Sequence, residues 1–197
     1  MYPYAVENTR ERLLELLVRH SFQQNADPIF TLASGRKSRY YINCKKTTFR
    51  PEAMVLIGRL FFERIKAVER RDGEQIDAVG GLTLGADPIA YAIAYHSALQ
   101  GMPIRAFSVR KEPKGHGAQN WVEGFEEQGA RVAIVEDVVT TGASTLRAID
   151  GALHAGFQIA AVLALVDRQE GGRDELKRKG YELEAIYTTV DLLNVLR

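Results

Sequence analysis

The sequence has almost no cysteine and no excess of charge of either sign. Cys44 is the single cysteine in 197 residues, which excludes an internal disulfide and any metal site built from several cysteines. The 26 Lys and Arg residues nearly balance the 25 Asp and Glu residues, so the formal net charge is +1 and no global field favours nucleic acid or a membrane surface. A site for an anion must therefore be local.

Long apolar runs are also missing. The nearest candidate for a membrane span, residues 159–166, is far shorter than the roughly 18 apolar residues that a span requires. The N-terminal stretch MYPYAVENTRERL lacks the apolar core of a secretory signal. We expect a cytoplasmic protein with no membrane and no nucleic-acid partner, and the length predicts a single domain over residues 1–197.

What the sequence does contain is one segment, RVAIVEDVVTTGAST (residues 131–145), in which several features follow without a gap. The apolar run at 132–135 predicts a buried parallel strand, and Glu136 with Asp137 is expected where that strand ends. Small residues at 140–145 precede a helix expected at 146–155. Backbone N–H groups and the dipole at a helix N-terminus favour a phosphate, and Gly142 permits the tight backbone of such a loop.

Carboxylates beside a phosphate suit sugar hydroxyls, or a divalent cation that bridges the sugar and a second phosphate group. The segment therefore fits a sugar that carries phosphates at both ends. An Asp/Glu turn followed by an ordinary Ser/Thr helix cap would give the same spacing and stays open at this point.

The whole segment resembles the signature of the type I phosphoribosyltransferases, which bind 5-phosphoribosyl-1-pyrophosphate (PRPP). The resemblance implies that the turn at 140–144 holds the ribose 5-phosphate while the acidic pair contacts the ribose 2- and 3-hydroxyls. The PRPP-binding residues it implies here are Glu136, Asp137, Val138, Val139, Thr140, Thr141, Gly142, Ala143 and Ser144. Glu136 replaces the commoner Asp and Ala143 a frequent Thr, but backbone N–H groups survive both changes.

A second segment, TLASGRKSRYYIN (residues 31–43), is expected to form a hairpin outside the main sheet, from strands at 29–32 and 39–43. It resembles the N-terminal substrate hood of the orotate phosphoribosyltransferases, in which Tyr41 and Ile42 occupy the positions of the paired residues that contact the orotate ring. Ala33 stands where some members carry Lys. An ordinary amphipathic hairpin is the alternative.

The turn in GGLTLGADPIA (residues 80–90), between a strand expected at 76–79 and a helix expected at 88–99, does not have the GxGxxG spacing of a dinucleotide site. In the phosphoribosyltransferases this turn meets the pyrophosphate, often through a strained and sometimes cis non-proline peptide. Thr83 and Leu84 lie where orotate enzymes of one branch have Tyr-Lys. One cation fewer therefore reaches the pyrophosphate from this turn.

The segment RKEPKGHG (residues 110–117) carries three cations, a histidine and two glycines, so it cannot enter a core, and a solvated surface loop is the alternative. It resembles the mobile catalytic loop of the orotate enzymes. Cleavage of the bond to pyrophosphate builds negative charge on the leaving group, which cations stabilise. The resemblance implies Lys114 as the catalytic contact, Arg110, Lys111 and His116 on pyrophosphate, and a homodimer in which the loop reaches the neighbouring site.

In VDRQEGGR (residues 166–173), Arg168 resembles the arginine that holds the orotate carboxylate, a task suited to a planar two-pronged donor. Its alternative is a surface salt bridge with Asp167 or Glu170. The resemblance also assigns Thr140 to orotate and names Asp137 as catalytic beside Lys114. Mg²⁺ is implied as the cofactor, held mainly by PRPP with no direct protein ligand.

Together these segments predict an α/β protein with the type I phosphoribosyltransferase fold. A central parallel β-sheet flanked by helices is expected at about 51–197, under a small hood and N-terminal helix at about 1–50. The implied reaction converts orotate and PRPP to orotidine 5-phosphate and pyrophosphate in de novo pyrimidine (UMP) biosynthesis. The alternatives are a purine phosphoribosyltransferase, which would share only the 136–142 segment, and a non-catalytic PRPP-sensing regulator.

Overall fold

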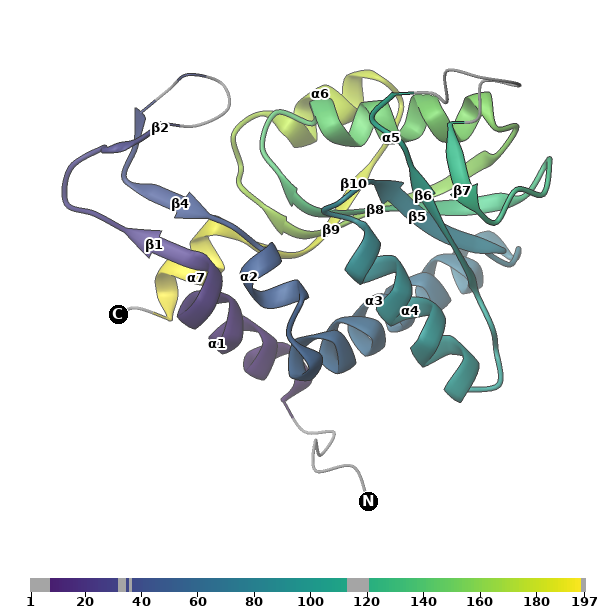
Figure 1. Cartoon of the computed structure of the whole chain (residues 1–197), viewed down its shortest axis with the longest axis horizontal. Helices are drawn as coiled ribbons and strands as arrows, with labels where there is room; N and C mark the ends of the chain where they lie inside the picture. Colours follow the sequence, from purple (N-terminus) through teal and green to yellow (C-terminus); the bar gives the residue numbers. More distant parts are fainter. Residues whose placement is uncertain (1–7, 32–34, 36, 113–120, 196–197) are drawn as a thin grey trace.

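The protein is built around one six-stranded sheet with helices on both faces (Figure 1). The computed structural model describes residues 8–31, 35, 37–112 and 121–195. Within them the strand order is β10-β9-β8-β5-β6-β7, and every neighbouring pair is parallel except β6 with β7. The strands of this sheet are β5 (Ala78–Leu82), β6 (Arg105–Val109), β7 (Val122–Gly124), β8 (Arg131–Val139), β9 (Gln158–Asp167) and β10 (Leu183–Thr188). The predicted parallel α/β sheet is confirmed, with one antiparallel strand added at an edge.

Two hydrophobic clusters, one on each face, hold the helices against the sheet. In β8, Ala133 and Val135 belong to the cluster under α3 and α4, whereas Val132 and Ile134 belong to the cluster under α5 and α6. This alternation is what a strand buried on both faces requires. The helices are α1 (Thr9–Ser21), α2 (Lys45–Thr48), α3 (Pro51–Asp72), α4 (Asp87–Leu99), α5 (Ala143–His154), α6 (Gly172–Arg178) and α7 (Thr189–Asn194).

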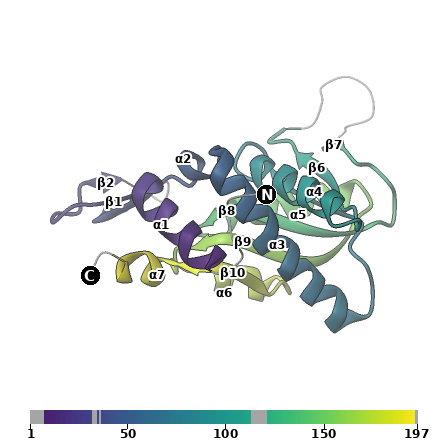
Figure 2. The same ribbon diagram turned by 90° about the horizontal axis from the view of Figure 1, so that it is seen from below.

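The hood lies beside the end of the sheet at which β8 and β9 finish, and it comprises α1, α2, α7 and two short ribbons (Figures 1 and 2). The expected single hairpin is wrong in its pairing. β4 (Tyr40–Ile42) pairs with β1 (Phe22–Gln24), and β2 (Phe30–Thr31) pairs with β3 (Lys37–Ser38). Tyr40 stacks on Phe22 within the β4–β1 pair, and Tyr41 stacks on Phe30 of β2 and so joins the two ribbons; in each contact the ring centroids are 5.8 Å apart.

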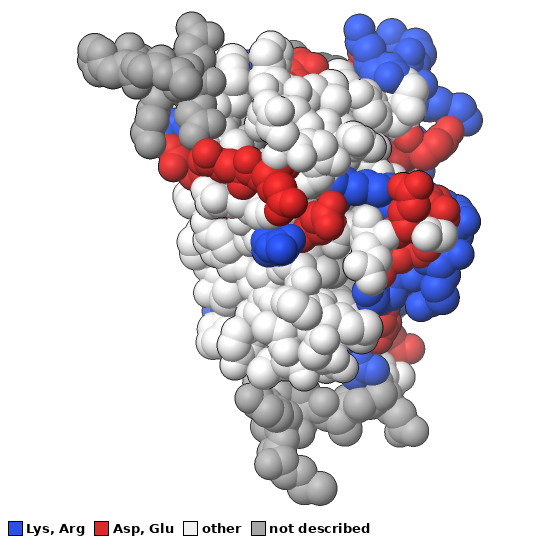
Figure 3. All heavy atoms as spheres, turned by 90° about the vertical axis from the view of Figure 1, so that its right-hand side faces the viewer, with Lys and Arg blue, Asp and Glu red and all other residues white. Residues whose placement is uncertain are grey.

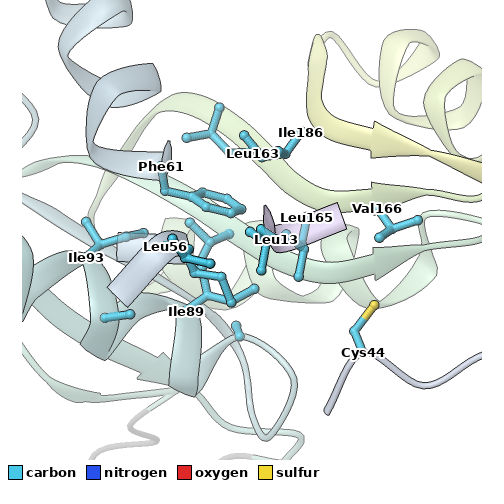
Figure 4. Close-up of a cluster of buried hydrophobic side chains, with 14 of the residues drawn as sticks. Leu13, Cys44, Leu56, Phe61, Ile89, Ile93, Leu163, Leu165, Val166 and Ile186 are labelled. Atoms are coloured by element: carbon cyan, nitrogen blue, oxygen red, sulfur yellow. The ribbon is translucent and has the colours of Figure 1, made fainter. Parts of the chain in front are cut away.

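The larger cluster joins the hood to the sheet. Figure 4 shows side chains from α1, α3, α4, β9 and β10 meeting in it, with Cys44 at its edge. Leu13 of α1, Phe61 of α3 and Ile89 of α4 are fully buried there. Burial of these apolar side chains holds the hood in place relative to the strand ends. Among the described residues, no helix combines the length and apolar character needed to cross a bilayer.

Several element boundaries differ from those expected. β8 continues to Val139 because its last residues pair with β9 as far as Asp167, so Glu136 and Asp137 lie inside the strand rather than after it. α5 begins at Ala143, before residue 146, because Gly142 adopts the left-handed conformation (φ 83°) at the N-cap. α3 continues to Asp72, beyond the expected end near residue 66. The short elements α2, β7 and α6 were not predicted.

Candidate active site

The candidate site gathers where β5, β8 and β9 end, since the carboxyl ends of parallel strands share one edge of a sheet. Three close approaches define it: the turn after β5 against β8, α2 of the hood against β8, and the residue after β9 against β4. Gly85 makes the first approach to Asp137, Lys45 the second to Asp137, and Arg168 the third to the Tyr40 carbonyl. Segments far apart in the sequence therefore surround the acidic pair.

Both carboxylates of the pair are buried, each with 4% of its surface exposed. Glu136 Oε1 accepts a hydrogen bond from the Asp137 N–H (3.2 Å), and Glu136 Oε2 accepts one from the Thr145 hydroxyl of α5 (3.4 Å). Burial, followed by the adjacent Asp137 charge, raises the pKa of Glu136 well above its ordinary value. The pair is thus poorly solvated, and its two carboxyl groups repel each other when both are ionised.

Asp137 has an unused oxygen. Its Oδ1 accepts a hydrogen bond from the Val138 N–H (2.9 Å), but its Oδ2 is buried without a hydrogen-bond partner and lies 3.7 Å from Lys45 Nζ. A methyl group at Gly85 would lie 2.7 Å from Asp137 Oδ1, so only glycine lets the turn come this close. A buried acceptor without a donor is costly, and a hydroxyl or a cation brought by a ligand would satisfy it.

The loop between β8 and α5 has the form of an anion cradle. Gly142 precedes α5, whose first N–H groups and dipole face the loop. The Gly172 N–H donates to the Thr140 carbonyl (2.9 Å), and a Cβ at Gly172 would lie 2.7 Å from that oxygen and 2.9 Å from Gly142 N. Thr141 and Ser144 are exposed. The start of α6 therefore supports the cradle from behind, and the hydroxyls of the loop remain accessible to a ligand.

Arg168 is buried, with 9% of its surface exposed. Its Nη2 lies 2.7 Å from Glu170 Oε1 and 3.5 Å from the Tyr40 carbonyl oxygen, whereas its Nε has no hydrogen-bond partner. Of the two acidic residues considered from the sequence, Glu170 is the partner, while Asp167 accepts hydrogen bonds from Arg173 and the Gln169 N–H. A buried guanidinium with one N–H unpaired still has capacity for an anion.

The two hood residues implied by the resemblance lie on opposite sides of β4. Tyr41 is 37% exposed and stacks on Phe30, whereas Ile42 is 6% exposed and belongs to the larger core cluster. Successive residues of a strand face opposite ways, so only one of the two side chains remains open to a ligand.

The basic loop is described only at its two ends. Arg110 Nη1 lies 2.6 Å from Glu123 Oε1, and the Arg110 N–H donates to the Trp121 carbonyl (2.9 Å), which closes the loop across β6 and β7. Lys111 is exposed. Lys114 and His116 lie outside the described residues. The peptide between Thr83 and Leu84 is cis, as the resemblance suggested for this turn.

Sequence reasoning missed Lys45 as a side chain that contacts the site, and it did not assign Thr145 to the acidic pair. Lys45 could be found only once α2 was known to lie against β8. Thr145 belonged to the expected polar loop, but it faces Glu136 because α5 starts early.

Burial, followed by the Asp137 charge, raises the pKa of the Cys44 thiol well above its ordinary value, so this cysteine is protonated.

Comparison with known proteins places these features in a family. No protein-family model matches the chain. An orotate phosphoribosyltransferase of Aquifex aeolicus is 46% identical over 184 residues, which are 93% of this chain and 97% of that protein. The crystal structure of Mycobacterium tuberculosis orotate phosphoribosyltransferase with Fe(III) dicitrate has a TM-score of 0.78 at 38% identity and covers 93% of this chain and 98% of that one. The structure of the same enzyme with PRPP has a TM-score of 0.73 at 35% identity with the same coverage. The chain belongs to the orotate phosphoribosyltransferase family.

Proposed function

We propose that the protein transfers the phosphoribosyl group of PRPP to orotate, giving orotidine 5-phosphate and pyrophosphate in pyrimidine nucleotide synthesis. The observation that carries this proposal is the meeting of two incompletely satisfied groups at one edge of the sheet. Asp137 has a buried oxygen without a donor, and Arg168 has a buried N–H without an acceptor. A sugar diphosphate and a carboxylate-bearing base supply the two missing partners.

PRPP is proposed to bind along β8 and the start of α5. The carboxylates of Glu136 and Asp137 accept hydrogen bonds from the ribose hydroxyls, and residues 140–144 hold the 5-phosphate through backbone N–H groups and hydroxyls. Val138 and Val139 contribute backbone between these two parts. The ribose is thereby fixed at both ends with its C1 facing the hood.

Orotate is proposed to bind between the hood and the end of β9. Arg168 holds its carboxylate, Tyr41 lies along the ring, and Ile42 contributes through its backbone because its side chain is in the core. Thr140 borders the base as well as the phosphate. Catalysis then comes from positioning orotate N1 opposite the leaving pyrophosphate, with no covalent enzyme intermediate.

The leaving pyrophosphate is proposed to meet the turn at 83–85 and the basic loop. Lys114 contacts the leaving oxygen in the transition state, and Arg110, Lys111 and His116 bind the remaining oxygens. In the described structure Arg110 is paired with Glu123, so engagement of pyrophosphate requires Arg110 to exchange one anion for another.

Mg²⁺ is proposed as the cofactor, carried in mainly by PRPP. Among the described residues no group of three or more metal-ligating side chains could hold a metal alone, whereas the buried pair of Glu136 and Asp137 fits hydroxyls that a divalent cation also touches. When bound, the cation neutralises pyrophosphate charge. Chelation with EDTA is expected to abolish turnover and added Mg²⁺ to restore it.

A homodimer is proposed, with α4 at its interface. α4 carries no Lys, Arg or Glu, and its outer side chains Tyr91, Tyr95 and Leu99 are 52%, 65% and 58% exposed. Figure 3 shows a broad uncharged area, crossed by an acidic band, on the side of the molecule at which α4, β6 and β7 lie in Figure 1. A helix face this apolar fits a second copy of the same chain.

The cytoplasmic location expected from the sequence stays a prediction.

The interface is tested by sedimentation of a Tyr95→Glu variant. We expect the wild-type dimer to become a monomer, because a charge would be buried in an apolar contact. Val190→Glu, at a residue 52% exposed on α7 in the hood, is the matched control and should leave the mass unchanged. A monomeric wild-type protein would contradict the dimer.

The reaction is tested by the absorbance of orotate on mixing with protein, Mg²⁺ and PRPP, beside a Lys114→Ala variant. We expect orotate consumption by the wild type and a loss of about 100-fold or more in kcat for the variant, the scale on which one transition-state contact acts. Consumption of adenine, hypoxanthine or xanthine instead would leave the PRPP site standing and contradict the assignments of the hood and Arg168. Binding of PRPP without turnover of any base would favour the regulator.

A further inference from the structure

Asp87, the first residue of α4, joins two segments that come from different strands. It is buried, with 8% of its surface exposed. Its Oδ2 accepts a hydrogen bond from the Thr83 hydroxyl, and its Oδ1 accepts one from the Ser108 hydroxyl, each at 2.7 Å. Thr83 belongs to the turn after β5, and Ser108 belongs to β6. One carboxylate therefore ties the turn to the neighbouring strand.

The position of this turn matters at the site, because it packs directly on the acidic pair. The space at Gly85 is so tight that an added Cβ would lie 2.7 Å from Asp137 Oδ1. A small shift of the turn must therefore move Asp137 or open a gap beside it. Misplacement of about 1 Å in such a constellation is enough to cost about 100-fold in rate.

The position of β6 matters for a second reason. Arg110, the first residue of the basic loop, follows β6 directly, and the Thr83 N–H donates to the carbonyl of Val109 at the end of that strand (2.9 Å). The turn and the start of the loop thus leave the sheet side by side. Asp87 fixes the side chain of one and the supporting strand of the other.

We propose that Asp87 is a positioning residue for the pyrophosphate group, one that holds the turn at 83–85 and the start of the basic loop in a common geometry. The inference rests on the proposed function, which gives both segments to pyrophosphate. Asp87 does not contact the substrate, because both of its oxygens are occupied by protein hydroxyls. Its acidity also suits the first turn of α4, where the helix dipole favours a negative charge.

Because the Asp87 carboxylate lies close to the proposed pyrophosphate site, the inference is tested by whether PRPP binds more tightly or more weakly when the charge of Asp87 is removed. If Asp87 acted on the ligand only through its charge, removal of the charge would tighten the binding of an anion. If Asp87 acts by position, Asp87→Asn weakens binding, since an amide offers a single acceptor oxygen to two hydroxyls. The two mechanisms therefore predict opposite changes from one substitution.

The experiment measures binding of PRPP with Mg²⁺ by calorimetry, together with KM for PRPP and for orotate, in Asp87→Asn, Thr83→Val and Ser108→Ala. We expect the Kd for PRPP to rise about 10-fold in Asp87→Asn, as for the loss of one hydrogen bond to a charged group, and less in the two hydroxyl variants. KM for orotate should stay within about two-fold of wild type, because the loss is confined to the pyrophosphate side.

The matched control is Asp77→Asn. Asp77 precedes the same strand β5 at its opposite end and accepts a hydrogen bond from the Arg131 N–H (2.8 Å). It should lower the unfolding temperature without changing Kd or either KM. The hydroxyl variants keep the test valid if Asp87→Asn folds poorly.

Unchanged or tighter PRPP binding in Asp87→Asn would overturn the inference, and so would an equal rise in both KM values. The binding arm separates this outcome from failure of the proposed function. If the wild type binds PRPP but does not consume orotate, the proposed function fails while the effect of Asp87 on PRPP binding is still decided.

Discussion

Charged side chains are fully paired at the start of strand β8 but incompletely paired near its end. At its start, Arg131 forms ion pairs with Asp72 and with Glu74 (Nε to Oε2, 3.2 Å), and its N–H donates to Asp77. Toward its end, two adjacent carboxylates are buried with one cation 3.7 Å away. The charges at the start of the strand are therefore paired with one another, whereas one oxygen of the carboxylates near its end still lacks a hydrogen-bond partner.

Unsatisfied polar atoms follow the same division. Within the part of the chain that the structure describes, four buried side-chain polar atoms lack a hydrogen-bond partner: Asn43 Oδ1, Thr48 Oγ1, Asp137 Oδ2 and Arg168 Nε. All four lie in the hood or at the carboxyl ends of β8 and β9. Buried polar groups are normally paired, so their concentration marks the end of the molecule that awaits a ligand.

The largest expected effect comes from exchanging an arginine at each end. Arg168→Ala should raise KM for orotate about 100-fold, because a buried bidentate contact to a carboxylate is lost, and Arg168→Lys should recover little of it since an ammonium lacks the planar fork. Arg131→Ala should leave KM unchanged and lower the unfolding temperature. Steady-state kinetics and calorimetric melting of all three variants measure both effects.

If Arg131→Ala raised KM for orotate as much as Arg168→Ala does, the contrast drawn between the two ends of β8 would be contradicted. In that case the paired charges at the start of β8 would influence the site through the strand. A lowered melting temperature alone would instead leave the comparison intact.

A smaller effect, of opposite sign in stability and binding, is expected for Glu136→Gln. Burial, then the Asp137 charge, raises the pKa of Glu136, so the folded state keeps this proton to higher pH than the unfolded chain does. The contribution of Glu136 to stability is therefore greatest below the ordinary pKa of a glutamic acid and is lost as the pH rises through its folded pKa. The variant should flatten this dependence and melt about 3 °C higher at pH 8, as expected for about 1 kcal/mol.

The same substitution should weaken PRPP binding about 10-fold, because the amide accepts less strongly from the ribose hydroxyls. Asp72→Asn is the control at the other end. The hydrogen bond from Arg71, followed by that from Arg131, lowers the pKa of Asp72, so its contribution is present above its ordinary pKa and is lost as the pH falls through its folded value. A stability of Glu136→Gln at or below that of wild type at pH 8 would contradict the destabilisation assigned to the buried Glu136 carboxylate.

The contrast between the two ends also explains what the sequence could predict. The order of strands and helices followed from apolar runs and turn residues, because burial on both faces of a parallel sheet leaves a strong local signal. The acidic pair and the cradle were found for the same reason, since they occupy one continuous segment. Arg168 was found through its resemblance to a family motif.

What could not be predicted depends on contacts between distant segments. β4 pairs with β1 rather than with β2, although its tyrosines stack on rings of both strands, and no local pattern records this choice. Lys45 beside Asp137, and Asp87 between Thr83 and Ser108, likewise join residues separated in sequence. The extension of β8 through Glu136 followed from pairing with β9, which overrides the weak strand preference of two acidic residues.

The smallest expected effect concerns Glu170, the carboxylate already on Arg168. An incoming orotate must share Nη2 with it or displace it, so Glu170→Gln should lower KM for orotate about three-fold, a modest change because the desolvation of a largely buried ion pair offsets much of its attraction. The ligand-free variant should melt at a lower temperature, because Arg168 loses the anion that balances its buried charge. Orotate should therefore raise the melting temperature more in the variant than in the wild type.

Glu182→Gln is the control for this last change, since Glu182 forms a surface pair with Lys177 (3.4 Å) and should alter neither quantity. A higher KM in Glu170→Gln would show that Glu170 orients the guanidinium for orotate rather than competing with it. In that case the end of β9 would hold a closed pair, like Arg131 and its partners at the start of β8, and the open charge at this edge of the sheet would belong to the acidic pair alone.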